Sequence, residues 1–392
     1  MESESDILIL GGGCAGLSLA LRLAADRNNC PSTVILESRA HYSNDRTWCF
    51  WDDGSAHLRE LVQHRWPEVM LTNGDNRVRA DCQRMPYSMI PAETFYTHAI
   101  AAFAETPFIN LAMDEPVVGE PRKEGGLWRV ETHRGTRSAK RLIDTRPQRV
   151  PERGAAVLWQ SFCGHEIECE MDCFVPGVAR LMDFMPSQKG RITFIYLLPF
   201  SPKRALIELT VFAPDPLGQD ELADELAAFI HGQIDGSSHT VLRSEYGVLP
   251  MGQAAIVPGP DASHVRVGVA AGGARAASGF AFQRIQRWAN ACAGELLAGR
   301  PPLSHPPDPS ITRAMDELFL HVLRTHPQRA PELFLALFSL QDPLRVMRFM
   351  SDDAGLADYI AIILVLPPRL FLREIPRMLW PRPNLREGAP NG

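Results

Sequence analysis

The sequence predicts an α/β protein with a strand–turn–helix unit at its N-terminus, a strand-rich middle and a helical C-terminal unit. The first unit is an apolar run, Asp6–Leu10, that leads through a glycine-rich turn into a densely apolar helix. In the middle, Arg191–Leu198 and Ala205–Phe212 are apolar, aromatic and β-branched, and Pro199–Lys203 between them is typical of a hairpin turn. From Pro309 onward, apolar residues recur at helical spacing. The 392 residues leave room for about two to three domains.

The composition indicates a folded protein and disfavours several classes. Lys and Arg total 40 against 46 Asp and Glu, and the resulting net charge of −6 disfavours nucleic acid as a partner. The acidic N-terminus, Met1–Asp6, lacks the positive charge of an export signal. The longest apolar run, Ile360–Leu366, is far shorter than the roughly 18 residues of a membrane span. We therefore expect a cytoplasmic protein without a transmembrane segment.

The eight cysteines are scattered along the chain. Cys163, Cys169 and Cys173 lie closest together, but they lack the paired CxxC spacing of a zinc site. We expect reduced thiols and no metal site.

The glycines after Leu10 match the pattern G-x-G-x-x-G through Gly11, Gly13 and Gly16. In this pattern, the glycines make a tight turn, let the backbone approach a pyrophosphate and allow close helix packing, with the phosphates at the helix N-terminus. A second strand, Val34–Leu36, is followed by Glu37, at the distance where a carboxylate accepts hydrogen bonds from ribose hydroxyls. This context predicts a Rossmann-like dinucleotide-binding domain; a glycine turn of another α/β protein is the alternative.

A second glycine pair, Gly272-Gly273, follows a predicted strand, Val265–Ala270, and precedes a helix through Ile285 and Trp288. The pair suggests that the chain returns to the same cofactor, as FAD proteins with a discontinuous nucleotide-binding domain do. FAD is therefore favoured over NAD. An unrelated strand-to-helix turn is the alternative.

The chain divides into three predicted units. A discontinuous FAD-binding domain covers residues 1–154 and 247–300, with a strand at Leu142–Asp144 and a polar linker at Gln148–Gly154. A substrate domain covers residues 155–246 and includes a helix at Gln219–Ile234. A C-terminal helical unit covers residues 301–392. It contains three predicted helices, at Met315–Leu323, at Glu332–Leu340 and after Asp342-Pro343.

One carboxylate, Glu208, interrupts the predicted strand Ala205–Phe212. Period-two alternation places Leu206 and Phe212 on the face of Glu208, while the opposite face is also apolar. A strand of this kind is usually covered on both sides, so burial should raise the pKa of Glu208 and keep it protonated near neutral pH. Glu208 is therefore a candidate acid catalyst.

An ion pair at a strand edge is the alternative for Glu208, with Lys203, Arg204 or Arg191 as the partner. If Glu208 is not the acid, Asp183 and Glu170 are the next candidates.

Further motifs recur along the chain in a characteristic order. They are Leu142–Arg146, Leu158–Gly164, Leu181–Phe184, Phe194–Pro199, Leu206–Thr210, Gly268–Phe280, Phe319–Leu323 and Val346–Asp352. Together with Asp6–Gly16, they resemble the flavin-dependent bacterial lycopene β-cyclases. The resemblance covers nearly the whole length of the chain.

This resemblance implies an FAD-binding fold like that of aromatic hydroxylases and a mixed β-sheet substrate domain. It also implies a reaction without net redox that needs reduced FAD, with NAD(P)H as the reductant. The implied substrate is lycopene or a related acyclic polyene, whose ψ-ends are closed to the β-rings of γ-carotene and β-carotene. The implied catalytic residue is Glu208, and the cofactor-binding residues are Gly11, Gly13, Gly16, Glu37, Gly268, Gly272 and Gly273.

Two positions depart from the family pattern. Glu208 is followed by Leu209, where the family has a second acidic residue, and Arg46 replaces the histidine of the family's His-Thr-Trp. We expect these departures to bear on rate and product choice more than on the fold.

Cyclisation requires protonation of a terminal double bond, shielding of a tertiary cation from water and removal of a proton after ring closure. Aromatic faces stabilise a desolvated cation by about 0.5–2 kcal/mol each, and core packing is the alternative role for each ring. The candidate rings are Phe194, Tyr196, Phe212, Trp48 and Trp51. An FAD-dependent monooxygenase or isoprenoid reductase, which would consume NADPH stoichiometrically, and a catalytically impaired flavoprotein are the alternative functions.

The segment after Pro367 combines cationic and apolar residues. Arg369, Arg373 and Arg377 lie at successive i+4 positions, and the tail carries a local charge of +3. A segment of this type can lie in an anionic membrane interface, so we expect peripheral association with the inner face of the cell membrane. Packing on the helical unit, with Pro376 ending the segment, is the alternative.

Overall fold

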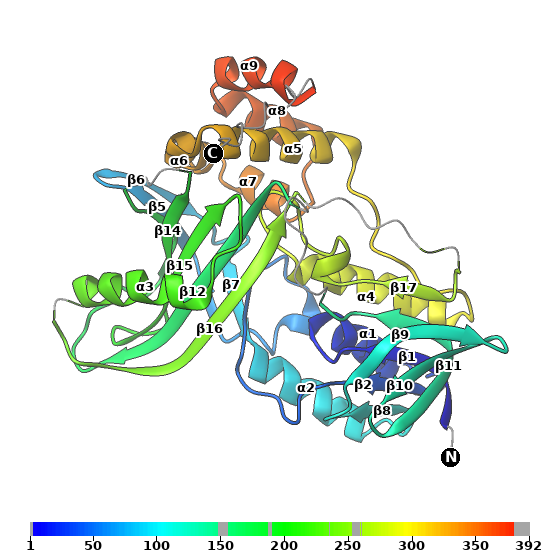
Figure 1. The fold of residues 1–392 in the computed structure, drawn as a ribbon. Helices are drawn as coiled ribbons and strands as arrows, with labels where there is room; N and C mark the ends of the chain where they lie inside the picture. Colours follow the sequence, from blue (N-terminus) through cyan, green and yellow to red (C-terminus); the bar gives the residue numbers. More distant parts are fainter. Residues whose placement is uncertain are drawn as a thin grey trace, which may run out of the picture.

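The computed structural model describes residues 3–147, 156–186, 190–234, 236–252, 259 and 261–379. These residues form two seven-stranded sheets, a three-stranded sheet and a group of C-terminal helices (Figure 1). The predicted linker at Gln148–Gly154 and the last residues of the tail lie outside the described ranges.

The first sheet has the strand order β8-β2-β1-β11-β10-β9, with β17 paired to β11. Pairing is parallel among β1, β2, β8, β11 and β17 and antiparallel from β11 to β9. The strands are β1 (Ser3–Leu10), β2 (Thr33–Leu36), β8 (Ile109–Ala112), β9 (Val117–Glu124), β10 (Leu127–Thr132), β11 (Gly135–Asp144) and β17 (His264–Arg266).

Both faces of the first sheet are covered, which explains why β1 and β2 are continuously apolar. The helices α1 (Cys14–Ala25), α2 (Ala92–Ala104) and α4 (Phe282–Leu297) enclose one core with Ile7 and Ile9 of β1. On the other face, Leu8 and Leu10 join a smaller core with β10. The turn between β1 and α1 is therefore fixed by packing on both sides.

The second sheet has the order β16-β12-β15-β14-β13-β5-β6. It is antiparallel except for the parallel pair β13–β5, so it is mixed, as expected. The strands are β5 (Glu68–Asn73), β6 (Asn76–Asp81), β12 (Leu158–Cys169), β13 (Val178–Phe184), β14 (Ile192–Pro199), β15 (Arg204–Ala213) and β16 (His239–Met251).

The second sheet is also covered on both faces. α3 (Gln219–Gln233) packs on one face, against Ile207, Leu209 and Val211. The other face, which carries Leu206 and Phe212, packs against C-terminal helices and a small sheet. That sheet has the order β3-β7-β4, with β3 (Thr47–Trp51), β4 (His64–Trp66) and β7 (Tyr87–Pro91).

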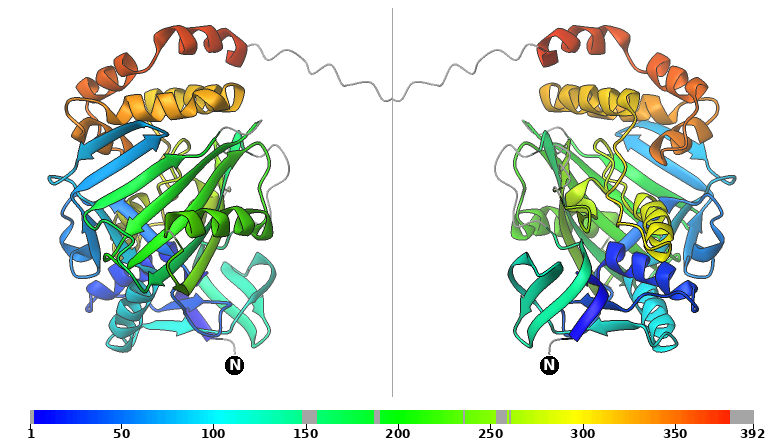
Figure 2. Two further views of the ribbon diagram at one scale, coloured as in Figure 1. Left: turned by 90° about the vertical axis from the view of Figure 1, so that its left-hand side faces the viewer. Right: turned by 90° about the vertical axis from the view of Figure 1, so that its right-hand side faces the viewer.

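The C-terminal helices lie at the end of the molecule far from the N-terminus (Figures 1 and 2). They are α5 (Ser310–Thr325), α6 (Ala330–Phe338), α7 (Leu344–Met350), α8 (Leu356–Val365) and α9 (Pro368–Leu379). Short 3₁₀ helices occur at Ala56–Leu58, Val269–Ala271 and Pro327–Arg329.

The structure confirms the predicted α/β class, the early β1–α1–β2 unit and the hairpin β14–β15. The predicted strand Val265–Ala270 is wrong in its second half, because Gly268 and Gly272 have φ of +94° and +85° and enclose a 3₁₀ turn. The prediction of three C-terminal helices was too low, since α8 and α9 follow them. Residues 68–81 of the N-terminal segment contribute β5 and β6 to the second sheet.

Candidate active site

The glycine turn after β1 depends on two close approaches. Gly11 has φ of +100°, a conformation that favours glycine. A Cβ on Gly16 would lie 2.1 Å from the carbonyl oxygen of Gly11, so a side chain there would push α1 away from the turn. Gly13 differs, because a Cβ built on it meets no heavy atom within 4 Å. The space beside Gly13 is open at the N-terminus of α1, where a helix favours a phosphate.

A second glycine segment lies against this helix. A Cβ on Gly268 would lie 3.7 Å from the Cβ of Ala15 in the first turn of α1. The N–H of Gly268 donates to His305 Nε2 at 3.0 Å. Burial, assisted by Arg284, lowers the pKa of His305 to about 4, so the ring is a neutral acceptor. Two segments separated by about 250 residues of sequence therefore meet at one helix end, as the predicted discontinuous site requires.

Gly272 and Gly273 continue this late turn. Gly272 has φ of +85°, and a Cβ on it meets no heavy atom within 4 Å. A Cβ on Gly273 would lie 2.6 Å from the carbonyl oxygen of Gly268. Gly273 therefore closes the turn, while Gly272 borders open space. The open backbone at Gly13 and Gly272 and the absence of acidic residues from the first turn of α1 fit a pyrophosphate-containing cofactor.

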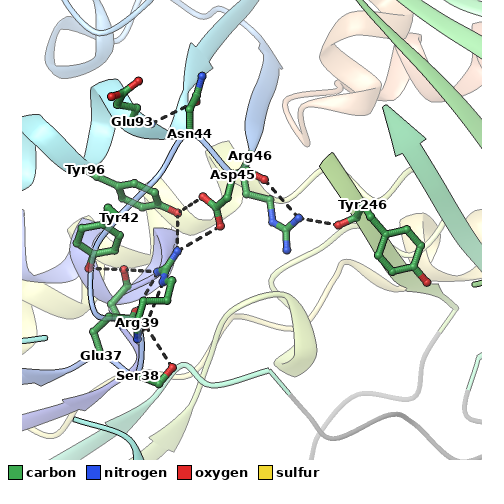
Figure 3. Close-up of polar contacts among 11 residues, drawn as sticks. Glu37, Ser38, Arg39, Tyr42, Asn44, Asp45, Arg46, Glu93, Tyr96 and Tyr246 are labelled. Carbon is green, nitrogen blue, oxygen red and sulfur yellow. Dashed lines mark hydrogen bonds and ion pairs between the residues drawn. The ribbon is translucent and has the colours of Figure 1, made fainter. Parts of the chain in front are cut away.

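Glu37 lies beside the first glycine turn, and Arg39 contacts its carboxylate (Figure 3). The N–H of Gly12 donates to its Oε2 at 2.9 Å, and a Cβ on Gly12 would lie 3.0 Å from the same oxygen. Arg39 donates to both carboxylate oxygens, at 3.0 Å from Nε and 2.9 Å from Nη2. Burial opposes ionisation of Glu37, but the hydrogen bonds from Arg39 outweigh it and lower its pKa.

Arg39 is itself held by aromatic and acidic groups. Its Nη1 donates to Asp45 and to the hydroxyl of Tyr96, both at 3.2 Å, and its guanidinium lies over the rings of Tyr42 and Tyr96 (Figure 3). Both Glu37 oxygens are thus occupied by strong donors. A ribose hydroxyl can bond to Glu37 only by sharing an oxygen with Arg39 or displacing it.

Glu208 lies in the middle of the second sheet, on β15 between β12 and β14. It is opposite Gly164 on β12 and Tyr196 on β14. Thr210 donates a hydrogen bond to its Oε1 at 2.9 Å. Burial, and then the proximity of Glu245, raises the pKa of Glu208 to about 8. The residue as a whole nevertheless keeps some accessible surface.

The alternative ion pairs of Glu208 are not formed. Each of the three cations has another partner: Arg191 pairs with Glu221, Arg204 with Glu166, and Lys203 donates to the carbonyl of Glu170. Of the other acid candidates, Asp183 lies near Arg180, at 3.6 Å, and Glu170 is exposed. Glu208 therefore forms none of the three ion pairs that the sequence suggested.

A second carboxylate, Glu245 on β16, was missed by the sequence analysis. It accepts hydrogen bonds from Thr47 Oγ1 at 3.0 Å and from Arg243 Nη1 at 2.8 Å. Neighbouring Arg46 donates to the carbonyl of Tyr246 at 2.7 Å (Figure 3). The Arg46–Thr47 pair thus joins β3 to β16 at the position of Glu245. Alternation within β16 puts Arg243 and Glu245 on one face, but no local pattern relates them to Glu208.

The predicted aromatic residues divide into separate groups. Tyr196 lies next to Glu208 and donates to Tyr87 at 3.0 Å, and burial raises the pKa of both phenols well above 10. Trp51 contacts Tyr87, and Phe194 packs edge-on against Phe212 farther along the same face. Trp48 is different, because it stacks on Phe282 in the core of the nucleotide-binding domain.

Cys49 connects this region to a cavity. Its partly buried thiol interacts with Tyr196, and desolvation raises its pKa to about 12. A small cavity of about 20 Å³ lies beside it, between β3, the start of α4 and the end of α7. The cavity is lined in part by Cys49, Trp51, Phe280, Phe282, Arg284 and Met350. Neutral polar groups thus lie between this cavity and Glu208.

Within the described ranges, no cluster of histidine, cysteine and acidic residues has the arrangement of a metal site. The cysteines in this part of the chain are free thiols.

Comparison with known proteins places these features in a context. A family model described as lycopene cyclase protein matches residues 6–375. A lycopene β-cyclase of Paracoccus sp. (strain N81106) is 29% identical over 414 aligned positions, covering 98% of this chain and 99% of the relative. A lycopene β-cyclase of Pantoea ananas is 24% identical over 256 positions, covering 64% of this chain and 63% of the relative.

Solved structures share the fold at low identity. A geranylgeranyl bacteriochlorophyll reductase-like protein from Thermoplasma acidophilum has a TM-score of 0.62 at 14% identity, covering 96% of this chain and 100% of that one. The p-nitrophenol 4-monooxygenase PnpA from Pseudomonas putida has a TM-score of 0.60 at 14% identity, covering 97% and 100%. These likenesses confirm the predicted fold, which is that of FAD-dependent monooxygenases and reductases.

Proposed function

The chain belongs to the lycopene cyclase protein family, and from this membership we propose that it closes ψ-ends of lycopene, or of a related acyclic polyene, into β-rings. The observation that carries the proposal is Glu208, a carboxyl group whose surroundings raise its pKa to about 8. Such a group is protonated at neutral pH and able to act as a general acid.

The reaction is an isomerisation, in which no electrons are gained or lost overall. Glu208 donates a proton to the terminal double bond of the polyene, and the resulting tertiary cation is attacked by a second double bond. A C–C bond closes the ring, and loss of a proton from a ring carbon forms the ring double bond. The proton count of substrate and product is the same, so the enzyme regains its starting charge.

The surroundings of Glu208 suit a cationic intermediate. Tyr196, Tyr87 and Cys49 remain uncharged at neutral pH, because burial raises the pKa of each group. Phenol rings provide π faces to a cation, and the buried site excludes the water that would otherwise add to it. Of the predicted rings, Tyr196 is the one in register with Glu208.

We assign FAD to the two glycine segments at the N-terminus of α1. Gly13 and Gly272 leave backbone space for the pyrophosphate, Gly11 and Gly16 shape the first turn, and Gly268 and Gly273 shape the second. We assign Glu37 to hydrogen-bond the ribose hydroxyls. Arg39 would then either share a carboxylate oxygen of Glu37 with the ribose or lose its hydrogen bond to that oxygen. Reduced FAD, when bound, supplies negative charge that stabilises the cation, and NAD(P)H is the proposed reductant.

Product analysis tests this function. Full-length protein loaded with FAD, reduced without oxygen and given lycopene should yield γ-carotene and β-carotene by chromatography, with far less than one NADPH consumed per ring. A monooxygenase or isoprenoid reductase would instead consume about one NADPH per product. A protein that binds FAD and lycopene without turnover would be the catalytically impaired flavoprotein.

The proposed polyene substrate also suggests that the protein contacts a membrane, and we assign this contact surface to α8 and α9. Apolar side chains project from α8 into solvent: Leu364 is 76% and Leu356 72% exposed. Arg369 and Arg373 are exposed on the adjoining α9. Apolar groups flanked by cations match an anionic bilayer interface. Among the described helices, none has the length and apolarity to span a bilayer.

The inner side of α9 packs on the protein. Glu374 is fully buried, and its carboxylate lies 3.1 Å from His326 and 3.4 Å from His321 of α5. Pro376 lies within α9, which continues to Leu379, so it does not end the segment. The helix thus packs on the helical unit through one face and exposes its arginines on the other. We propose peripheral association with the inner face of the cell membrane, with lateral entry of the polyene.

A further inference from the structure

A glycine separates the two carboxylates of the second sheet. β12 lies between β15 and β16, and Gly164 of β12 is in register with Glu208 on one side and Glu245 on the other. Adjacent strands are about 4.8 Å apart, so two residues on either side of a strand are separated by about 10 Å at the backbone. A side chain at the middle position would fill this gap. Gly164 leaves it free.

The available space is shared by both carboxylate side chains. A Cβ on Gly164 would lie 3.3 Å from Glu208 Cβ and 3.3 Å from Glu245 Cγ. Both side chains therefore border the same space over the glycine, and the proximity of Glu245 helps to raise the pKa of Glu208.

The two carboxylates have unequal surroundings. Glu245 forms an ion pair with Arg243 at 2.8 Å and accepts the Thr47 hydroxyl at 3.0 Å. Arg243 also forms an ion pair with Glu166 at 2.6 Å. Glu208 accepts the uncharged hydroxyl of Thr210. Because two adjacent buried carboxylates are not both ionised at low cost, the negative charge belongs on Glu245 and the proton on Glu208.

We propose that Glu245 is a positioning residue for the acid: its charge, fixed by Arg243 and Thr47 across Gly164, holds the transferable proton on Glu208. The proposal rests on the cyclase function and deepens it. When Glu208 gives its proton to the alkene, two negative charges face each other across Gly164. This repulsion makes Glu208 a better base, so it favours return of the proton that leaves the ring carbon.

The titratable groups that surround Glu208 and Glu245 keep their charge near neutral pH, so a titration in this range is not due to them. Arg243 remains a cation, with its pKa raised by Glu245 and Glu166 against the effect of burial. The thiols and phenols remain neutral, because burial raises the pKa of each. They are Cys49 on β3, Cys163 on β12, Tyr196 on β14 and Tyr87 on β7.

The test compares Glu245→Gln with a matched control, Glu166→Gln. Both variants remove one carboxylate that pairs with Arg243. Glu166, however, is opposite Leu206 on β15, two residues along the strand from Glu208. The pH dependence of kcat/KM for lycopene would be measured on reduced, FAD-loaded, full-length protein. In parallel, infrared spectroscopy of the FAD-loaded protein would follow the protonated carboxyl band of Glu208, identified by its loss in Glu208→Gln.

We expect Glu245→Gln to move the midpoint of both titrations down by about one unit or more, because a like charge is removed. For a shift of about one unit, activity should fall roughly threefold at about pH 7.5 and roughly tenfold at about pH 9, while activity at about pH 5.5 stays close to that of wild type. Glu166→Gln should shift the midpoint by less than about 0.3 unit, and Glu245→Asp, which keeps the charge, should stay near wild type. If Glu245→Gln folds poorly, the charge-neutral double variant Arg243→Gln/Glu245→Gln should still lower the midpoint.

An unchanged midpoint in Glu245→Gln, or an equal shift in Glu166→Gln, would overturn the proposal. Failure of the cyclase function is a separate result, in which wild type forms no cyclic product. The infrared titration reports the coupling between Glu208 and Glu245 in that case as well.

Discussion

Replacing Glu208 with Gln is expected to stabilise the folded protein at neutral pH. The pKa of this carboxyl rises from 4.5 to about 8 on folding. Between these values, the folded chain keeps a proton that the unfolded chain releases, so the contribution of Glu208 to the free energy of unfolding falls as pH rises. Each unit costs about 1.4 kcal/mol, which gives about 3 kcal/mol between roughly pH 5 and pH 7.5. The amide of Gln keeps the shape and does not titrate.

Urea denaturation of FAD-loaded wild type and Glu208→Gln at several pH values measures this effect. The difference in unfolding free energy should move in favour of the variant by about 3 kcal/mol over that range and become constant above about pH 8. Exposed Glu170, changed to Gln, is the control for loss of a carboxylate. A wild type–variant difference that is independent of pH would refute a raised pKa of Glu208.

Three further predictions concern the cofactor and the membrane. Gly13→Val should weaken FAD binding without loss of folding, because a Cβ at this position meets open space in the protein. Gly13→Ala should weaken FAD binding less. Full flavin occupancy of purified Gly13→Val would contradict the assignment of FAD to this turn. Glu37→Ala should also reduce flavin content, through loss of the ribose acceptor and of the bond to Gly12. The variant Ile363→Ser/Leu364→Ser should float less with anionic liposomes than wild type. The control Val175→Ser changes a side chain elsewhere that is 72% exposed, and it should float like wild type. Equal flotation of both variants would exclude α8 as the membrane contact.

Local patterns predicted those parts of the fold that depend on neighbouring residues. The strand, glycine turn and helix at Asp6–Ala25 follow from a contiguous stretch, and the hairpin of β14 and β15 follows from alternation around one turn. The transfer of β5 and β6 to the second sheet was not predictable in this way. The partner of β5 is β13, which lies about 110 residues later in the chain. α8 was missed because its apolar residues continue around the helix, which removes the polar face that marks helical spacing.

The candidate site shows the same division. Burial of Glu208 was predictable, since both faces of its own strand are apolar. Its relation to Glu245 was not, because it depends on the register of β15 and β16 on either side of Gly164. Thr47 illustrates the limit further: it lies in a motif that sequence analysis noted, but its partner Glu245 is 198 residues away. Identifying such contacts requires the sheet order as well as the pattern within each strand.

Turnover by Glu208→Gln tests the central claim most directly. The variant protein, loaded with FAD, reduced and given lycopene, would be compared with wild type by chromatography of the products at about pH 7. Because an amide cannot donate the proton, β-ring formation should fall by about 10²–10⁴-fold, with flavin content and folding unchanged. A loss of less than about threefold would contradict the assignment of Glu208 as the acid and would direct attention to Asp183 or Glu170.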